Sequence, residues 1–590
     1  MKNWIYFILL ISLVACKNKP GKEKSTSMKN INTLLESYYE ERLQFFPLEA
    51  TAIADNRYND TLTIDISSSF REKIKSFYNK YKNEINEIDR STLDDHEQLS
   101  YDVFKREMDI QLEELTFNDN LMPVNQFWSM HLTFPVLGSG SGNQPFKTVK
   151  DYNDFLKRID DFSAYIDTAI LNMRMGMAEK VVPPALLMKK VLPQIKGIIV
   201  TDPTKSVFYD PIKNIPSSFS ENDKSDFKQK YTNAITQTIV PAYQRLYDFI
   251  SKEYIPNCRS TDGISEIPLG RKYYAYLTKV WTTTDMTPDQ IFELGEKEVA
   301  RIRSEMEKVM NETGFKGDLK SFFNFIHTDK RFMPFKTDSE VINSYRSIEL
   351  RMKPRLKELF NLVPKAAFEV RQTEKFREAS ASAEYNQAAP DGSRPGIFYV
   401  PVIDATKFNV VGMEDLFLHE AIPGHHYQTS IQQENDSLPK FRRFGWYGAY
   451  GEGWALYCES LGKELGLYTD PYQYFGSLSE EMHRAIRLVV DVGIHTKGWT
   501  REQAIKYSLE NEAESESDIT AEIERYMAIP GQALAYKIGQ MKIIEIRKRA
   551  EEKLGTKFNI KSFHDEVLKD GCLPLDVFEN KMNRWIEKSK

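Results

Sequence analysis

Hydrophobic and polar positions follow a helical period over most of the chain. From about residue 30, apolar side chains recur at intervals of three and four residues, as at Ile31, Leu34 and Leu35. This spacing places them on one face of an α-helix. The same period predicts long helices over much of residues 30–120 and 149–178. We therefore expect a mostly α-helical fold.

One segment departs from this period. Residues 396–403, with the sequence GIFYVPVI, are rich in β-branched and aromatic side chains and follow the turn residues Asp391 and Gly392. This composition is typical of a strand. Because Pro401 has no N–H to donate to a neighbouring strand, we expect an edge strand in a small β-sheet.

Residues 1–16, with the sequence MKNWIYFILLISLVAC, have the features of a signal peptide. Lys2 supplies the positive start, and the apolar run that follows is too short to span a bilayer as a helix. The last four residues, LVAC, resemble the bacterial lipobox, which implies cleavage before Cys16 and acylation of that cysteine. The alternatives are an ordinary signal peptide and a short anchor helix.

We assign residues 17–28 to a flexible tether, because Lys17 to Ser27 contains no large apolar side chain to bury. Residues 29–590 are then one α-helical domain. This part contains no run of about 18 apolar residues. We therefore expect a protein that is lipid-anchored to a bacterial membrane on its extracytoplasmic side, in the periplasm or at the cell surface.

The composition excludes several classes of protein. The chain has 590 residues, of which 41% are hydrophobic and 28% charged, as in folded domains rather than disordered or polytopic membrane proteins. The net charge is −6 with acids and bases intermixed, so we expect no nucleic-acid partner. After Cys16 only three cysteines remain, which cannot form a disulfide framework. Nothing in the sequence indicates an oligomeric state.

Candidate chemistry concentrates in a cluster of histidines. The sequence HEAIPGHH begins at His419, and His followed by Glu is how a zinc-binding helix with a general base begins. That motif needs its second His at position 423, which is proline here. On a regular helix His425 would lie about 120° off the His419 face, and His426 about 10.5 Å along the axis. Neither could share with His419 an ion bound at about 2.0–2.1 Å.

Pro423 and Gly424 change this geometry. Pro423 cannot donate to the carbonyl of His419, and Gly424 tolerates the backbone angles of an interrupted helix. A bulge that absorbs two residues would bring His425 into the ligand position, and one that absorbs three would bring His426 there. We favour His425 and keep His426 as the alternative. Two interior histidines beside a kinked helix are the interpretation without a metal.

A second helix is expected to supply the remaining ligand. Glu452 and Glu459 are seven residues apart, on one helical face and two turns from each other. Glu452 would bind zinc, and Glu459 would hydrogen-bond and orient a ligand histidine. The alternative is an amphipathic helix with two solvated acids.

Downstream residues are candidates for binding and catalysis. His495 could donate a hydrogen bond to substrate, and Tyr536 could donate to the oxyanion of a tetrahedral intermediate. Arg525 could hold a substrate carboxylate with two hydrogen bonds, and its neighbour Tyr526 is a further candidate for substrate binding. The alternative for each is an ordinary structural role.

These motifs together resemble the bacterial domain of unknown function 885 family. The matching segments are HEAIPGHH from His419, EGWALY from Glu452, DVGIH ending at His495, and RY with the following PGQALAY from Arg525 to Tyr536. With weaker matches upstream, the resemblance covers nearly the whole mature chain.

The family is more remotely similar to the thimet-oligopeptidase-like and carboxypeptidase-Taq-like gluzincins. Glu452 lies 33 residues after His419 and Glu459 seven further on, while Gly531 and Tyr536 repeat a downstream spacing of those enzymes. The Pro-Gly expansion and Gln532, where those enzymes have a further tyrosine, are departures that put substrate scope in doubt.

The resemblance implies a multi-helix, gluzincin-like cleft with a small β-sheet beside the active site. It implies a zinc peptidase in which His419, His425 and Glu452 hold the ion and Glu420 is the general base. Strand 396–403 would then hold a peptide by edge pairing. The alternatives are a non-catalytic peptide-binding lipoprotein with the same fold and an amidase that acts on cell-wall peptides.

Overall fold

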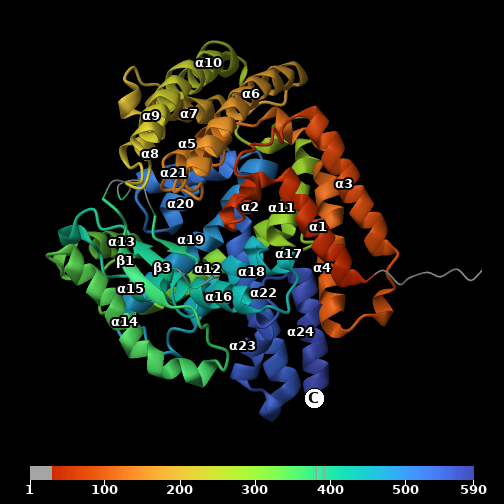
Figure 1. Ribbon diagram of the computed structural model, residues 1–590. Helices are drawn as coiled ribbons and strands as arrows, with labels where there is room; N and C mark the ends of the chain where they lie inside the picture. Colours follow the sequence, from red (N-terminus) through yellow and green to blue (C-terminus); the bar gives the residue numbers. More distant parts are fainter. Residues whose placement is uncertain (1–29, 376–377, 379–381, 390–391, 393) are drawn as a thin grey trace, which may run out of the picture.

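The computed structural model describes residues 30–375, 378, 382–389, 392 and 394–590 (Figure 1). The predicted signal peptide with Cys16 and the predicted tether lie outside the described residues. The described chain is mostly α-helical with one three-stranded sheet, which confirms the predicted fold class. None of its helices combines the length and the apolar character that crossing a bilayer requires.

The described chain begins with five helices, three of which pack together through aromatic rings. The five are α1 (Ile31–Phe45), α2 (Pro47–Ala52), α3 (Ser68–Asn86), α4 (Asp95–Glu114) and α5 (Met130–Gly138). The ring of Tyr38 stacks on Phe77 with centroids 5.3 Å apart and meets Phe104 edge-on at 4.8 Å. These rings join α1, α3 and α4 into a small core of their own.

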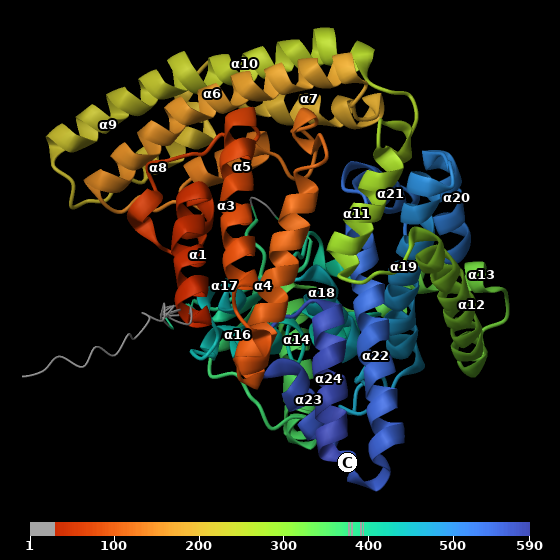
Figure 2. The same ribbon diagram turned by 90° about the vertical axis from the view of Figure 1, so that its right-hand side faces the viewer.

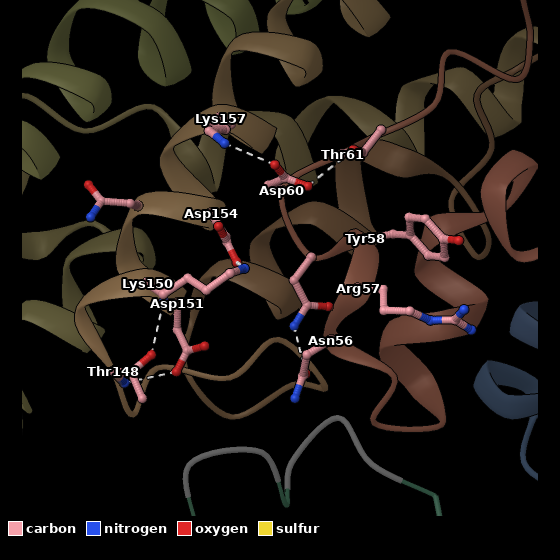
Figure 3. Close-up of polar contacts among 12 residues, drawn as sticks. Asn56, Arg57, Tyr58, Asp60, Thr61, Thr148, Lys150, Asp151, Asp154 and Lys157 are labelled. Atoms are coloured by element: carbon pink, nitrogen blue, oxygen red, sulfur yellow. Dashed lines mark hydrogen bonds and ion pairs between the residues drawn. The ribbon is translucent and has the colours of Figure 1, made fainter.

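Five consecutive helices form a layer across one end of the molecule (Figure 2). They are α6 (Val149–Glu179), α7 (Ala185–Ile198), α8 (Asp210–Lys213), α9 (Glu221–Ala234) and α10 (Val240–Phe249). Arg158 of α6 is fully buried and donates to the carbonyls of Tyr58 and Thr61, both at 3.0 Å. Beside it Lys157 pairs with Asp60 at 2.9 Å (Figure 3). These bonds fix the segment between α2 and α3 on α6.

The rest of the chain surrounds one buried helix, α19. The helices here are α11 (Gly270–Thr282), α12 (Pro288–Glu312), α13 (Leu319–Thr328), α14 (Asp338–Leu359), α15 (Met413–Glu420), α16 (His425–Glu434), α17 (Lys440–Arg443), α18 (Gly448–Ser460), α19 (Pro471–Thr496), α20 (Arg501–Asn511), α21 (Glu516–Ala528), α22 (Ala535–Leu554), α23 (Ile560–Leu568) and α24 (Leu575–Ser589). Every residue of α19 from Ala485 to His495 is buried. Leu488 faces one large core, and Val489 and Val490 face the other. Because it is enclosed on all sides, α19 is a rigid support for side chains that point out of it.

The sheet contains β1 (Phe368–Gln372), β2 (Glu384–Asn386) and β3 (Gly396–Val400) in the order β1-β3-β2. β3 pairs parallel with β1 and antiparallel with β2. The expectation of an edge strand at 396–403 is therefore wrong, because β3 is central. Pro401 lies one residue beyond the end of β3, so its lack of an N–H group removes no hydrogen bond from the sheet.

Helices α18 and α22 approach closely enough to require glycine at their contact. A Cβ atom on Gly539 would lie 1.7 Å from the carbonyl oxygen of Ala449, and one on Gly453 would lie 2.5 Å from the backbone of Gly539. Real Cβ atoms do not come that near to backbone atoms, so both positions need a residue without a side chain. The crossing holds α18, which carries Glu452, against the core.

We expect Gly539→Ala to lower the free energy of unfolding by at least about 1–3 kcal/mol, because the added methyl group must push the two helices apart. Thermal and urea denaturation measure the change. Gly197→Ala in α7 is the matched control, because a Cβ there meets no atom within 4 Å. It should be neutral or stabilising by about 0.5–1 kcal/mol. Equal stability of the two variants would contradict the close crossing.

Candidate metal centre

The histidine motif spans a break between two helices. α15 ends at Glu420 and α16 begins at His425, so the interruption is a complete loop rather than the bulge within one helix that we expected. Within this loop, a Cβ on Gly424 would lie 1.9 Å from the carbonyl oxygen of His419, so only glycine fits. Trp454 of α18 donates its indole N–H to the carbonyl of Pro423 at 2.9 Å. That bond fastens the loop to the helix that carries Glu452.

Three of the predicted ligands converge at this break. The Nε2 atoms of His419 and His425 lie 3.6 and 3.5 Å from the same carboxylate oxygen of Glu452. Two ligand atoms each about 2.1 Å from a tetrahedral ion lie about 3.4 Å apart. The spacing of the three side chains therefore fits zinc held by two nitrogens and one oxygen.

The rings of His419 and His425 are held in place in different ways. Nδ1 of His419 hydrogen-bonds the buried carboxylate of Glu459 at 2.6 Å, which orients the ring as predicted. Nδ1 of His425 is buried without a hydrogen-bond partner in the described part of the chain. Its ring is instead set by packing against His419 and Trp446, at centroid distances of 4.8 and 5.9 Å.

His426 lies on another side of α16. Its Nδ1 is 2.9 Å from the hydroxyl of Tyr385 and 3.4 Å from that of Ser430. Burial lowers the pKa of His426 to about 4, so the ring is neutral. Of the two histidines that the sequence left open, the structure brings His425 to His419 and Glu452.

Glu420 lies beside the ligand atoms. One of its carboxylate oxygens and one nitrogen from each of His419 and His425 lie within 4.8 Å of one another, which makes Glu420 a second possible ligand. The separations of 3.6 and 3.5 Å from Glu452 match the spacing expected for ligands of one ion, so we assign Glu452 as the ligand and Glu420 as its neighbour. Burial raises the pKa of Glu420, whereas the two histidines oppose that rise.

The charges at the centre are complementary to a cation. Burial by itself would raise the pKa of Glu452, but its hydrogen bonds with His419 and His425 hold that pKa well below the usual range. Glu452 is therefore ionised. Carboxylates collected around two histidines in the interior are costly without a positive charge between them.

A cavity of about 750 Å³ opens onto these residues, and we call it the metal cavity. Its lining is Phe127, Ser382, Ala383, Glu384, Tyr385, Gln387, His419, Glu420, His425, Thr429, Trp446, Glu452, Arg484, Arg487, Glu522, Arg525 and Tyr536. Tyr385 belongs to β2, so the sheet lies beside the site. The volume is in the range of sites that enclose small molecules or short peptides.

Tyr536 lines the metal cavity on the side of α19. Its ring lies under the guanidinium groups of Arg487 and Arg484, at 4.7 and 5.6 Å from its centroid. Neither arginine was predicted from the sequence to belong to the site. Their spacing of three residues on one face of α19 was visible, but charged pairs at that spacing are common on ordinary solvated helices.

Arg525 reaches the metal cavity but is already paired. It makes two hydrogen bonds to Glu522, at 3.0 and 2.8 Å, and one to Gln532 at 2.6 Å. Tyr526 is buried, and its hydroxyl accepts from Arg487 and donates to Glu522. The structure therefore places Arg525 at the cavity and Tyr526 behind it.

His495 is not brought to the site. Its Nδ1 accepts from the N–H of Ile264 and its Nε2 donates to the carbonyl of Tyr526, both at 3.0 Å. The ring is fully buried, and burial lowers its pKa to about 3. Both nitrogens are thus used inside the fold. The expectation that His495 contacts substrate is corrected to a structural role for this residue.

Among the solved structures that are similar to this chain are two candidate lipoproteins. A candidate lipoprotein from Colwellia psychrerythraea is 28% identical, with a TM-score of 0.87, and the match covers 95% of this chain and 99% of that one. A candidate lipoprotein of unknown function from Shewanella oneidensis is 19% identical, with a TM-score of 0.74 over 94% and 100% of the two chains. The similarity to the chain from Shewanella oneidensis shows a shared fold. No curated protein matches the chain.

The comparison with protein families gives a match over nearly the whole described chain. The family is that of bacterial proteins of unknown function DUF885, and residues 47–582 match it. This span contains both helices of the histidine motif, α18 and the remaining walls of the metal cavity. The chain therefore belongs to the DUF885 family of bacterial proteins.

Proposed function

We propose that this protein is a zinc-dependent peptidase. The observation that carries the proposal is the equal approach of one Glu452 oxygen to His419 and His425, with a further carboxylate, Glu420, beside them. Zinc held there would polarise a carbonyl group and make water acidic enough to deprotonate near neutral pH. Glu452 and the two histidines would hold the ion, and Glu459 would keep His419 oriented.

The protein's own side chains account for the proton transfers. Glu420 would accept the proton of the attacking water and pass it to the leaving amine. Tyr536, on another wall of the metal cavity, would donate its hydroxyl to the oxyanion of the tetrahedral intermediate. The guanidinium groups of Arg484 and Arg487 over its ring would hold it in place.

A peptide is the substrate that suits the sheet beside the site. Among the described residues β2 is a terminal strand of the sheet and pairs with β3, and a terminal strand is where an extended chain can add to a sheet. Glu384 and Tyr385 of this strand line the metal cavity. The role of edge pairing that we gave to residues 396–403 therefore passes to β2.

The alternative of a binding protein without activity explains fewer residues. Such a protein would need ligands for a metal or a peptide but no carboxylate beside them. Glu420 is buried at a cost in free energy, which a general base justifies and a binding site does not.

We further propose that the chain is anchored by lipid at Cys16, on the extracytoplasmic side of a bacterial membrane. The lipobox-like sequence LVAC supports this, as does the description of the relative from Colwellia psychrerythraea as a candidate lipoprotein.

Zinc content tests the ligand assignment. His419→Ala, His425→Ala and Glu452→Ala should each lose most of the zinc, because three protein ligands leave none to spare. His426→Ala is the matched control and should keep it, since its ring faces Tyr385. Elemental analysis of the purified variants gives the answer. Full zinc content in His425→Ala, or its loss in His426→Ala alone, would overturn the assignment.

Glu420→Gln tests the general base. The amide keeps the shape of the carboxylate but cannot accept a proton, so we expect zinc and thermal stability to be retained. Peptide hydrolysis should fall by roughly 100-fold or more. The measurement is turnover of a peptide library by mass spectrometry, with zinc content determined on the same sample. Turnover at the rate of the parent protein would remove Glu420 from the mechanism.

Cys16→Ser tests the anchor. Without the acylated cysteine the protein should move from the membrane fraction to the soluble fraction, because multiple acyl chains provide the attachment. Fractionation followed by detection of the protein is sufficient. Membrane association of the variant at the level of the parent would show that another feature holds the protein there.

A further inference from the structure

A second cavity, of about 520 Å³, lies between the N-terminal helices and α11, and we call it the aromatic cavity. Tyr78 of α3, Tyr165 of α6 and Tyr273 of α11 are among the rings that line it. Two tryptophans complete one side, Trp128 and Trp281, with ring centroids 5.9 Å apart. More than half of the surface of Trp128 is exposed, at 56%, so a large ring faces open space.

Two carboxylates in this cavity form no ion pair in the part of the chain that the structure describes, although the charges of Arg71 and Arg42 reach Glu114. Glu114 of α4 makes no side-chain hydrogen bond or ion pair within the described part of the chain, and burial, with Asp119 nearby, raises its pKa to about 7. Asp65 is hydrogen-bonded by Tyr165 and no lysine or arginine among the described residues pairs with it. Burial raises its pKa as well.

Two of the three arginines that line the aromatic cavity form ion pairs with carboxylates. Arg42 is held by both oxygens of Glu49, at 2.9 and 2.7 Å. Arg71 pairs with Asp119 at 2.9 Å.

Arg259, the third cation of this lining, donates to the carbonyls of Val182, Thr261 and Gly263. Burial lowers the pKa of Arg259, and the nearby negative charges of Asp262 and Glu266 partly oppose that change. Because the N–H groups of Arg259 are used by these carbonyls, the acceptors left for a ligand are the carboxyl groups of Glu114 and Asp65, and a cation bound beside them would favour their ionised form.

We propose that the aromatic cavity binds the basic side chain of a peptide, an ammonium or guanidinium group on an apolar stem. Aromatic faces attract a cation and also cover the apolar stem. The carboxylates of Glu114 and Asp65 supply the charge-assisted hydrogen bonds. A cavity of about 520 Å³ is large enough for such a side chain with part of its backbone.

The position of the aromatic cavity relates it to the metal cavity. Phe127 lines the metal cavity and its neighbour Trp128 lines the aromatic cavity. Near the end of α21, Arg525 lines the metal cavity and Met527 lines the aromatic cavity. A peptide could therefore place a basic residue in one cavity and a bond to be cleaved in the other, an extension that rests on the proposed peptidase function.

Binding of a small probe tests the proposal without any need for catalysis. The probe is N-acetyl-lysinamide, titrated against the intact protein while the tryptophan fluorescence is recorded, since Trp128 and Trp281 line the cavity. We expect a saturable change. The same probe acetylated on its side-chain amine has the same stem without the charge, and it should bind at least about tenfold more weakly.

Variants assign the binding to this cavity. The double variant Asp65→Asn with Glu114→Gln should weaken binding of the lysine probe about tenfold or more. Glu113→Gln is the matched control, because Glu113 pairs with Lys279 outside the cavity and the variant should bind as the parent does. Calorimetry of Trp128→Phe should still detect binding while the fluorescence change is reduced.

Each outcome is decisive. Equal binding of the two probes, or an unchanged dissociation constant in the double variant, overturns the proposal. If the double variant does not fold, as judged by its thermal unfolding, Glu114→Gln alone and the comparison of the two probes on the parent protein decide. A fluorescence change abolished by Trp446→Phe instead would place the probe in the metal cavity and also overturn it. Binding of lysine without peptide hydrolysis would leave this inference standing and count against the peptidase.

Discussion

The hydrogen bond between Nδ1 of His419 and the carboxylate of Glu459, 2.6 Å long, holds together two helices whose relative position the candidate metal centre depends on. It joins the end of α15 to the end of α18, and Glu452 stands two turns earlier on the same face of α18. A shift of one helix along the other would separate Glu452 from the histidines. Since tetrahedral zinc tolerates only small changes in ligand spacing, the zinc site that we propose would need this register to be rigid.

Several features of the fold protect that register. The bond from Trp454 to the carbonyl of Pro423 ties the loop between α15 and α16 to α18. On its other side α18 is pressed against α22, where Gly453 and Gly539 allow the backbones to touch. The glycines at this crossing and at position 424 therefore serve one purpose, which is to let three helix segments approach more closely than side chains would permit. Small residues far from the ligands thus contribute to the geometry of the site.

The sequence singled out the two carboxylates of α18, which lie on one uninterrupted helix. Glu452 and Glu459 were recognised because a helix repeats its face every seven residues, and α18 is regular over that span. The choice between His425 and His426 could not be made, because it depends on backbone angles at a break that no periodicity describes. A bulge was expected and two separate helices are found. The decisive contact, between His426 and Tyr385, involves a strand about 40 positions away in the chain.

The predictions for Pro401 and His495 were wrong for a related reason. Pro401 was taken to mark an edge strand, but whether a proline disturbs a ladder depends on where the strand ends, which the composition of residues 396–403 does not specify. His495 was grouped with the functional histidines, yet its partners Ile264 and Tyr526 come from distant segments that satisfy both of its nitrogens. A local motif indicates that a polar residue is needed in a place. It does not indicate whether that place is open to a substrate or closed within the core.

On α19, burial distinguishes the polar residues that are closed within the core from those that face the metal cavity. This helix lies between the two large cores, so most of its polar residues must be satisfied internally, as His495 and Asp491 are. Arg484 and Arg487 lie on the same helix where it borders the metal cavity, and there they face the ring of Tyr536. Because the enclosed helix cannot move without disturbing both cores, those arginines and the tyrosine beneath them are held at fixed positions relative to the ligands. The burial of α19 between the two large cores is therefore what allows it to position one wall of the site.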